Sequence, residues 1–151
     1  MGAPFSILIV DDDRAMRASL VDLLEAAGWR VEALPRASQV IDRLAGLAPD
    51  VILSDVRMPD MSGLELLAKL DATAPPVVLI SAHGDIPMAV QAMQEGAYSF
   101  VEKPYDPRRL LSILRHAAEQ HRMARGTDRL RARLAELSGL DRILLGTTPE
   151  I

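Results

Sequence analysis

The chain contains no cysteine, few aromatic residues and no apolar run long enough to cross a membrane. Without cysteine, neither disulfide bonds nor thiol chemistry can contribute to its structure or activity. A membrane-spanning helix needs about 20 consecutive apolar residues, and no stretch of the sequence approaches that length. The apolar residues 7–10 are too few for a signal peptide and run directly into acidic residues. These absences argue against disulfide-rich and membrane-spanning proteins, and we expect a cytoplasmic protein.

The sequence does contain enough apolar residues for one core, together with an uneven distribution of charge. Hydrophobic residues make up 49% of the 151 residues, which suffices for one domain with a short appendage. Residues 1–106 carry 16 acidic and 8 basic side chains, whereas residues 107–151 carry 5 and 9. The acidic part suits a metal cation better than a nucleic acid. Arginines interspersed with leucines in the basic part are more typical of a solvated helix face, so no direct contact with nucleic acid is expected.

Short apolar runs alternate with amphipathic helical patterns along most of the chain. The predicted strands are residues 5–10, 29–34, 51–54, 77–80 and 98–101. Helices are predicted at 14–27, around a buried face of Val40, Ile41 and Leu44, after a capping box at 62–65, at 86–95, and from 107 onward. Five strands alternating with five helices predict a parallel sheet with right-handed crossovers. We therefore expect an α/β fold: a doubly wound, flavodoxin-like five-stranded parallel sheet of order 2-1-3-4-5 with an extended C-terminal helix.

Residues of complementary chemistry lie where the predicted strands end. Asp11 and Asp12 follow the first strand, Asp55 follows the third, Ser81 follows the fourth and Lys103 comes after the fifth. The carboxyl ends of parallel strands meet at one edge, and open α/β sheets bind ligands there. Three converging carboxylates repel one another unless a cation neutralises them, and oxygen ligands select a hard cation such as Mg²⁺. A nearby hydroxyl and ammonium suit the transfer of a phosphoryl group to Asp55.

Each of these residues also has an ordinary structural explanation when it is taken alone. A single aspartate at a strand end usually caps a turn, and a single serine or lysine there is usually a turn or surface residue. The combination is far more specific than any of its members. Asp13 is expected to cap the first helix rather than bind the metal. His83, His116 and His121 have no metal-ligand spacing, and we expect structural or solvent-exposed roles for them.

Four short motifs stand at the predicted strand ends: Val10-Asp-Asp-Asp13, Asp55-Val-Arg-Met-Pro59, Ser81-Ala82 and Lys103-Pro104. With these motifs, residues 5–122 resemble the receiver domain of bacterial two-component response regulators. The resemblance implies that Asp55 is the phosphoacceptor and that Ser81 and Lys103 contact the phosphoryl group. It implies that the metal ligands are Asp11, Asp12, Asp55 and the backbone carbonyl of Arg57. It further implies a cis peptide bond before Pro104 and a conformational switch formed by Ser81 and Phe100.

Two longer segments, residues 83–91 and 95–104, resemble the nitrogen-regulatory (NtrC) class, and within it the regulators of dicarboxylate transport. Members of that class activate sigma-54-dependent transcription through an AAA+ ATPase domain and a C-terminal DNA-binding domain. Residues 144–151 are similar to the first residues of such an ATPase domain. The resemblance therefore implies a receiver domain at 1–122, a helical coiled-coil linker at 123–143 and the start of a truncated AAA+ domain at 144–151. No P-loop motif occurs, so nucleotide hydrolysis by this chain is not expected.

The partners implied by the resemblance are a cognate sensor histidine kinase and a second copy of the chain. The chain is expected to be a regulatory domain that promotes phosphotransfer to, and hydrolysis from, its own Asp55, and not an enzyme acting on a separate substrate. A homodimer is expected through the fourth and fifth helices and the linker. A heptad that starts at Ile113 has a mostly apolar column of d positions and a half-polar column of a positions. The d positions are His116, Met123, Leu130 and Leu137, and the a positions are Ile113, Gln120, Thr127 and Leu134. Gly126 costs ~1 kcal/mol in a helix interior, so it either breaks the last helix or weakens it.

Other functional classes fit the residues less well. A haloacid-dehalogenase-like phosphatase carries a second acid two residues after its aspartate, where this chain has Arg57. A nucleotide- or flavin-binding protein of the flavodoxin type would need a glycine-rich or hydroxyl-rich loop after the first strand, where three aspartates stand here. A degenerate receiver that only dimerises would not need a complete set of site residues.

Overall fold

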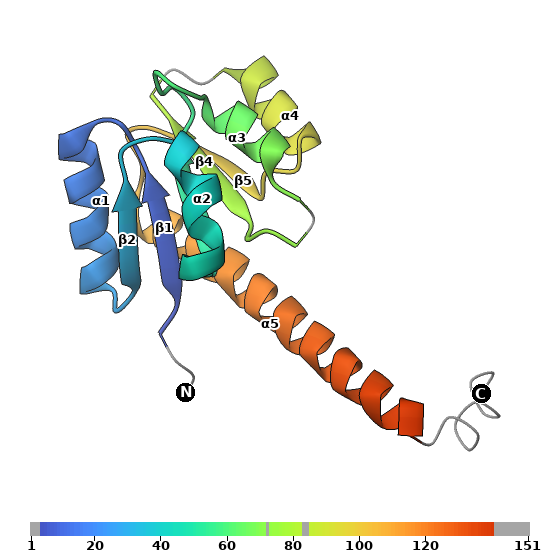
Figure 1. The fold of residues 1–151 in the computed structure, drawn as a ribbon. Coiled ribbons are helices and arrows are strands. Elements are labelled where there is room, and N and C mark those ends of the chain that lie inside the picture. Colours follow the sequence, from blue (N-terminus) through green and yellow to red (C-terminus); the bar gives the residue numbers. More distant parts are fainter. Residues whose placement is uncertain (1–3, 72, 83–84, 141–151) are drawn as a thin grey trace. The chain divides into compact units, whose positions relative to one another are not determined.

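The computed structural model describes residues 4–71, 73–82 and 85–140, with side chains of the last helix described up to Arg125. Five parallel strands form one sheet in the order β2-β1-β3-β4-β5 (Figure 1). The strands are β1 (Ser6–Val10), β2 (Arg30–Leu34), β3 (Val51–Asp55), β4 (Val77–Ser81) and β5 (Ser99–Glu102). The predicted fold class and strand order are confirmed.

One helix follows each strand. The helices are α1 (Arg14–Ala26), α2 (Ser38–Leu47), α3 (Gly63–Lys69), α4 (Ile86–Gln94) and α5 (Pro107–Leu140). The chain divides into two compact units, Met1–His121 and Arg122–Ile151, and the sheet lies in the first. The backbone of α5 is helical through Gly126, so that glycine does not break the helix. Among the described helices, none combines the length and the apolar character that a membrane span requires.

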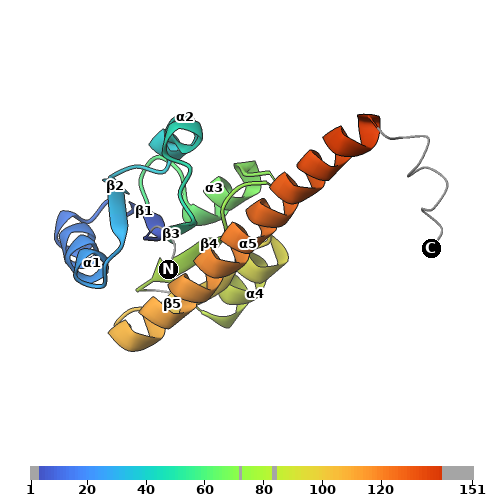
Figure 2. The same cartoon turned by 90° about the horizontal axis from the view of Figure 1, so that it is seen from below.

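Helices lie on both faces of the sheet (Figures 1 and 2), and an apolar core lies between the sheet and the helices on each face. Successive side chains of a strand point to opposite faces, so Ile7 and Ile9 of β1 lie in one core and Leu8 lies in the other. The first core is covered by α1 and the beginning of α5, and the second by α2, α3 and α4. This two-sided burial explains why β1, β3 and β4 are continuous apolar runs rather than alternating ones.

The helix starts agree with the sequence predictions, whereas the predicted burial of Ile41 does not. Oδ1 of Asp13 accepts hydrogen bonds from the first turn of α1, and Ser62 and Glu65 form the predicted capping box of α3. Ile41 was expected in the core, but its side chain is 42% exposed while Val40 is fully buried. The prediction for Ile41 is wrong because α2 contacts the core through a narrow stripe at alternating three- and four-residue spacing (Ala37, Val40, Leu44 and Leu47), and Ile41 lies beside that stripe.

Gly63 brings the start of α3 into direct contact with the end of β3. Its N–H donates a hydrogen bond to the carbonyl oxygen of Val56 at 2.8 Å. A Cβ atom at this position would lie 2.6 Å from the carbonyl oxygen of Asp55 and 2.9 Å from Cδ2 of Leu79. Such distances are shorter than van der Waals contact allows, so only glycine fits without a shift of the backbone. The close approach helps to fix the chain at Asp55.

Replacing Gly63 by alanine should therefore destabilise the protein. We expect Gly63→Ala to lower the free energy of unfolding by about 2 to 3 kcal/mol, because the new methyl group overpacks a backbone contact. Gly46 is the matched control, because it is an exposed residue of α2 and a methyl group added there would meet no atom within 4 Å. Gly46→Ala should raise the free energy of unfolding by about 0.5 to 1 kcal/mol. Urea denaturation measures both, and equal values for Gly63→Ala and the parent protein would contradict the close approach.

Candidate functional site

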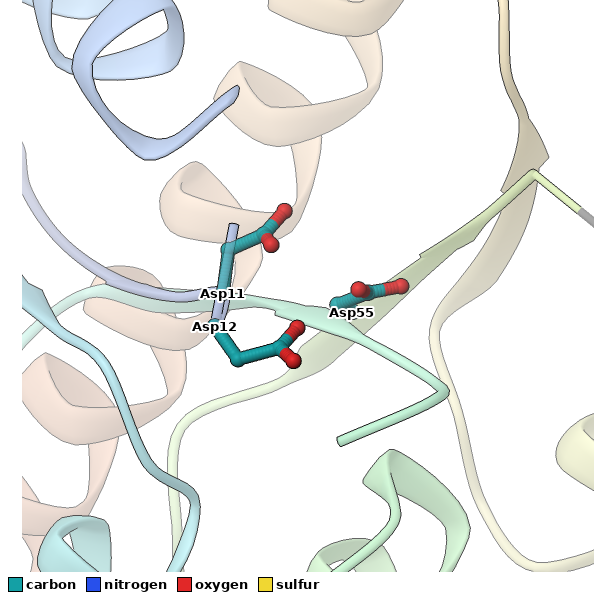
Figure 3. Close-up of side chains that lie close together, drawn as sticks. All are labelled: Asp11, Asp12 and Asp55. Carbon is teal, nitrogen blue, oxygen red and sulfur yellow. The ribbon is translucent and has the colours of Figure 1, made fainter. Parts of the chain in front are cut away.

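Asp11, Asp12 and Asp55 lie together at the carboxyl edge of the sheet. Asp11 and Asp12 directly follow β1, and Asp55 is the last residue of the neighbouring strand β3. The register pairs Val10 with Ser54, which places the two strand ends side by side. Figure 3 shows the three side chains, and one carboxylate oxygen from each lies within 4.8 Å of the others. The three carboxylates that we predicted would converge therefore do so.

The two inner carboxylates are buried, and this determines their acidity. Asp11 is fully buried and Asp55 is 8% exposed, whereas Asp12 is exposed. Burial raises the pKa of Asp11 above its usual value of 3.8. Burial, and secondly the negative charge of Asp11, raise the pKa of Asp55 from 3.8 to about 6. The geometry thus makes simultaneous ionisation of both carboxyl groups unfavourable unless positive charge is added.

Lys103 supplies part of that positive charge. Its Nζ lies 3.5 Å from Oδ2 of Asp11 and 3.9 Å from Oδ1 of Asp55. Lys103 follows β5, and its backbone N–H donates to the carbonyl oxygen of Ser81 at 2.9 Å, which ties the two loops together. The Lys103-Pro104 peptide bond is cis, as the sequence resemblance implied. Three carboxylates lie beside this single ammonium group, so Lys103 neutralises only part of the negative charge of the cluster.

The donor set fits a hard divalent cation. Oδ1 of Asp11 accepts a hydrogen bond from the N–H of Asp13 at 2.9 Å, but its buried Oδ2 has no hydrogen-bond partner among the described residues. This oxygen has only the 3.5 Å ion pair with Lys103, and with two further carboxylates beside it the environment is rich in the oxygen ligands that Mg²⁺ or Ca²⁺ takes. An open pocket of about 610 Å³ lies next to the cluster, lined by Asp12, residues 56–59 and Met88 among others. The cluster can therefore hold a metal ion with room for further ligands.

The other predicted residues are placed on the elements around the carboxylates. Ser81 is the last residue of β4 and is buried, and the strand register sets it one position beyond Ile80, the partner of Asp55. Phe100 lies in β5 opposite Leu79 and packs, partly buried, against the core on the α2–α4 face. Arg57 has an exposed side chain in the loop after β3, and the role of its carbonyl group remains a prediction. His116 is exposed, and His83 lies outside the described residues.

Two residues that the sequence analysis did not identify support the backbone of the site. Nη1 of Arg17 donates to the carbonyl oxygen of Asp11 at 2.7 Å from the first turns of α1. The carboxylate of Asp60 accepts a hydrogen bond from the N–H of Ser38 at 3.1 Å. A basic residue six positions after Asp11 was a signal that could have drawn attention to Arg17. No local signal could have identified Asp60, because its partner belongs to a distant helix.

The raised pKa of Asp55 predicts how the stability of the metal-free protein depends on pH. Between pH 4 and pH 6 the folded state retains a proton that the unfolded chain has released, so the free energy of unfolding should fall as pH rises. Asp55→Asn removes this charge, and at pH 8 it should unfold with a free energy about 1 to 2 kcal/mol higher than the parent. At pH 4 the two proteins should be nearly equal. Urea denaturation in the presence of EDTA measures the free energy of unfolding of both proteins. Equal values for the parent and Asp55→Asn at pH 8 would contradict the raised pKa of Asp55.

Comparison with known proteins identifies the family. Residues 7–115 match the model of the response regulator receiver domain. The chain is 42% identical over 154 residues to the C4-dicarboxylate transport transcriptional regulatory protein DctD of Rhizobium meliloti, covering 99% of this chain and 33% of DctD. It is 32% identical over 145 residues to the DNA-binding transcriptional regulator NtrC of Escherichia coli, covering 95% of this chain and 30% of NtrC. The chain thus spans about a third of the length of these two regulators.

A solved structure agrees with both the fold and the family. The crystal structure of full-length FixJ from B. japonicum superposes with a TM-score of 0.75 at 38% identity, covering 89% of this chain and 68% of FixJ. The matched residues include Asp11, Asp12 and Asp55 and extend past Lys103. The chain belongs to the response regulator receiver domain family.

Proposed function

We propose that this protein is a phosphorylation-controlled receiver in which Asp55 accepts a phosphoryl group from the phosphohistidine of a sensor kinase. The observation that carries the proposal is the cluster of Asp11, Asp12 and Asp55 within 4.8 Å, with the ammonium group of Lys103 beside it. Membership of the receiver family supports it. Mg²⁺ is the proposed cofactor, because it prefers carboxylate and carbonyl oxygens and bridges to phosphate.

The residues of the site have distinct proposed roles. Asp11, Asp12, Asp55 and the backbone carbonyl of Arg57 would hold Mg²⁺, and the bound ion would neutralise negative charge on the carboxylates and on the phosphoryl oxygens. An oxygen of Asp55 attacks phosphorus as the bond from phosphorus to the histidine nitrogen breaks. Lys103 and Ser81 contact the phosphoryl oxygens and hold them in line. Hydrolysis of the resulting aspartyl phosphate by water returns the domain to its starting state, so the protein regulates itself and acts on no separate substrate.

Phosphorylation would be read out through Ser81 and Phe100. A phosphoryl group on Asp55 adds negative charge beside the end of β4, which attracts the hydroxyl group of Ser81. Phe100 is only partly buried, and in this proposal its ring would turn into the space that Ser81 leaves. Because Phe100 has no hydroxyl group, packing alone would set the balance between its two positions. Its movement would reshape the surface of α4 and β5.

The surface of α4 suits an interface with a second copy of the chain. Ile86, Val90 and Met93 are 80%, 50% and 50% exposed, and their spacing places them on one face of α4. We propose a homodimer through α4, α5 and the linker at 123–143, where Met123 is also exposed. Exposed apolar residues at helical spacing are what such an interface buries. Phosphorylation would select between two arrangements of this dimer.

The downstream output is proposed from the similarity to DctD and NtrC. A receiver domain at 1–122, the linker, and an AAA+ ATPase domain starting at 144–151 would form part of a longer activator of sigma-54-dependent transcription. Residues 141–151 lie outside the described residues. DNA binding would then belong to a further domain, and the receiver would control it without touching nucleic acid.

Labelling of the protein tests the phosphoacceptor. In the presence of Mg²⁺ and either a phosphorylated kinase or acetyl phosphate, the parent should gain one phosphoryl group, which intact-protein mass spectrometry detects. Asp55→Asn should abolish the labelling, because the amide is not a nucleophile for this transfer. Asp71→Asn, at an exposed turn outside the site, is the matched control and should label like the parent. Full labelling of Asp55→Asn, or equal labelling of the parent with and without Mg²⁺, would refute the assignment of Asp55 as the Mg²⁺-dependent phosphoacceptor.

Sedimentation tests the proposed dimer interface, and NMR of the Phe100 ring tests the proposed switch. Residues 1–151 should be dimeric at concentrations on the order of tens of micromolar, and residues 1–122 should be largely monomeric, because the linker contributes a paired seam.

In complex with Mg²⁺ and beryllofluoride, which imitates the phosphoryl group, the NMR signals of the Phe100 ring should move. Equal monomer masses for the two lengths would refute the linker dimer, and unchanged Phe100 signals would refute the switch.

A further inference from the structure

Helix α2 begins without a capping side chain of its own. Its N-cap residue is Ala37, which makes no side-chain cap, whereas α1, α3 and α4 each begin at a residue whose side chain accepts a hydrogen bond. The first four N–H groups of a helix have no partner within the helix. One of those groups, the N–H of Ser38, donates to Oδ2 of Asp60 at 3.1 Å. The missing cap is therefore supplied by a residue 22 positions further along the chain.

The contact is favourable for a carboxylate. Hydrogen bonds from the side chain of Ser38 and, to a smaller extent, from its backbone N–H hold the pKa of Asp60 below its usual value of 3.8. A negative charge at the start of a helix also interacts well with the helix dipole. Asp60 is exposed, so solvent screens these interactions and their contribution to overall stability is small. The importance of Asp60 lies in the segment that it holds.

Asp60 belongs to the loop that links Asp55 to α3. Both ends of this loop are anchored: Val56 is held by the hydrogen bond from Gly63, and Ser62 by the capping box of α3. Residues 57–61 between these anchors lie in neither a helix nor a strand. Two methionines of this segment pack against the core, and Asp60 ties its exposed side to α2. The loop is therefore fixed on its apolar side by packing and on its polar side by the contact with Ser38.

Pro59 stiffens the backbone between Asp60, which contacts Ser38, and Arg57. The proline ring fixes its own φ angle and restricts the conformation of Met58 before it. The short stretch from Arg57 to Asp60 therefore has few accessible conformations. Holding Asp60 against α2 would consequently restrain the peptide group between Arg57 and Met58, which carries the Arg57 carbonyl oxygen.

We propose that Asp60 is a positioning residue for the metal centre: by capping α2, it holds residues 57–61 so that the Arg57 carbonyl faces the three carboxylates. The inference rests on the proposed function, because it concerns the Mg²⁺ site that we assign to Asp11, Asp12 and Asp55. Binding linkage is reciprocal, so Mg²⁺ should also stabilise the first turn of α2. Asp60 itself touches neither the metal nor the phosphoryl group.

Calorimetric titration of the whole chain with Mg²⁺ alone tests the proposal. Asp60→Ala should weaken Mg²⁺ binding roughly three- to tenfold, at or below the range known for residues that orient a metal ligand. Asp60→Asn should recover most of the affinity, because its amide oxygen can accept the same hydrogen bond from Ser38. Asp71→Ala is the matched control: its carboxylate accepts from the N–H of Thr73 at 2.8 Å in a turn, and its loss should leave the affinity unchanged. In the parent, Mg²⁺ should slow amide hydrogen exchange at Ser38, and Asp60→Ala should remove this effect.

The outcomes separate this proposal from the proposed function. Parent affinity in Asp60→Ala would overturn the positioning role, and so would an Asp60→Asn affinity as low as that of Asp60→Ala, since the charge and not the contact would then matter. An equal loss in Asp71→Ala would overturn it as well. A parent protein that neither binds Mg²⁺ nor labels at Asp55 would instead refute the proposed function. In that case, the Asp60 cap of α2 can still be tested without metal. Equal rates of amide hydrogen exchange at Ser38 in the metal-free parent and in metal-free Asp60→Ala would refute the cap.

Discussion

Two carboxyl groups, those of Asp11 and Asp55, are buried close together with one ammonium group near them. The electrostatic repulsion between the two carboxyl groups is the constraint on which the rest of the site depends. The arrangement is unfavourable for the protein alone, because both groups lose hydration and each opposes ionisation of the other. It becomes favourable when positive charge enters. Electrostatic repulsion of this kind between carboxylates is relieved by a bound cation, which is the role that we propose for Mg²⁺. Surrounding elements serve to keep the two groups from moving apart.

The parallel sheet provides that rigidity. β1 and β3 are neighbours with a fixed register, and apolar cores on both faces prevent either strand from shifting. Beyond the strands, each loop of the site has a separate restraint. Arg17 holds the carbonyl of Asp11, Lys103 is tied to Ser81, and Gly63 contacts the backbone next to Asp55. The site therefore combines side chains held in fixed positions with an open pocket beside Asp12 and residues 56–59.

Much of this could be read from the sequence because the responsible interactions are local or periodic. Apolar runs located the strands to within about one residue, and Asp13 and Ser62 marked the helix starts. The convergence of Asp11 and Asp55 followed from the rule that parallel strands end at one edge. Ile41 was misplaced because periodicity does not state how wide the buried stripe of a helix is. The contact between Asp60 and Ser38 could not be foreseen, since it depends on how two loops are placed in space.

The contact at Gly63 also limits how this sequence can diverge. A side chain at that position would meet the carbonyl oxygen of Asp55 and the Cα atom of Val56, which every amino acid possesses. A clash with a neighbouring side chain can be relieved when that neighbour mutates to a smaller residue. A clash with backbone atoms cannot be relieved in this way, because a mutation leaves those atoms in place. Only the contact with Leu79 could be relieved by such a compensating change. Lineages that keep this loop geometry therefore have no gradual route away from glycine at position 63, whatever changes occur around it.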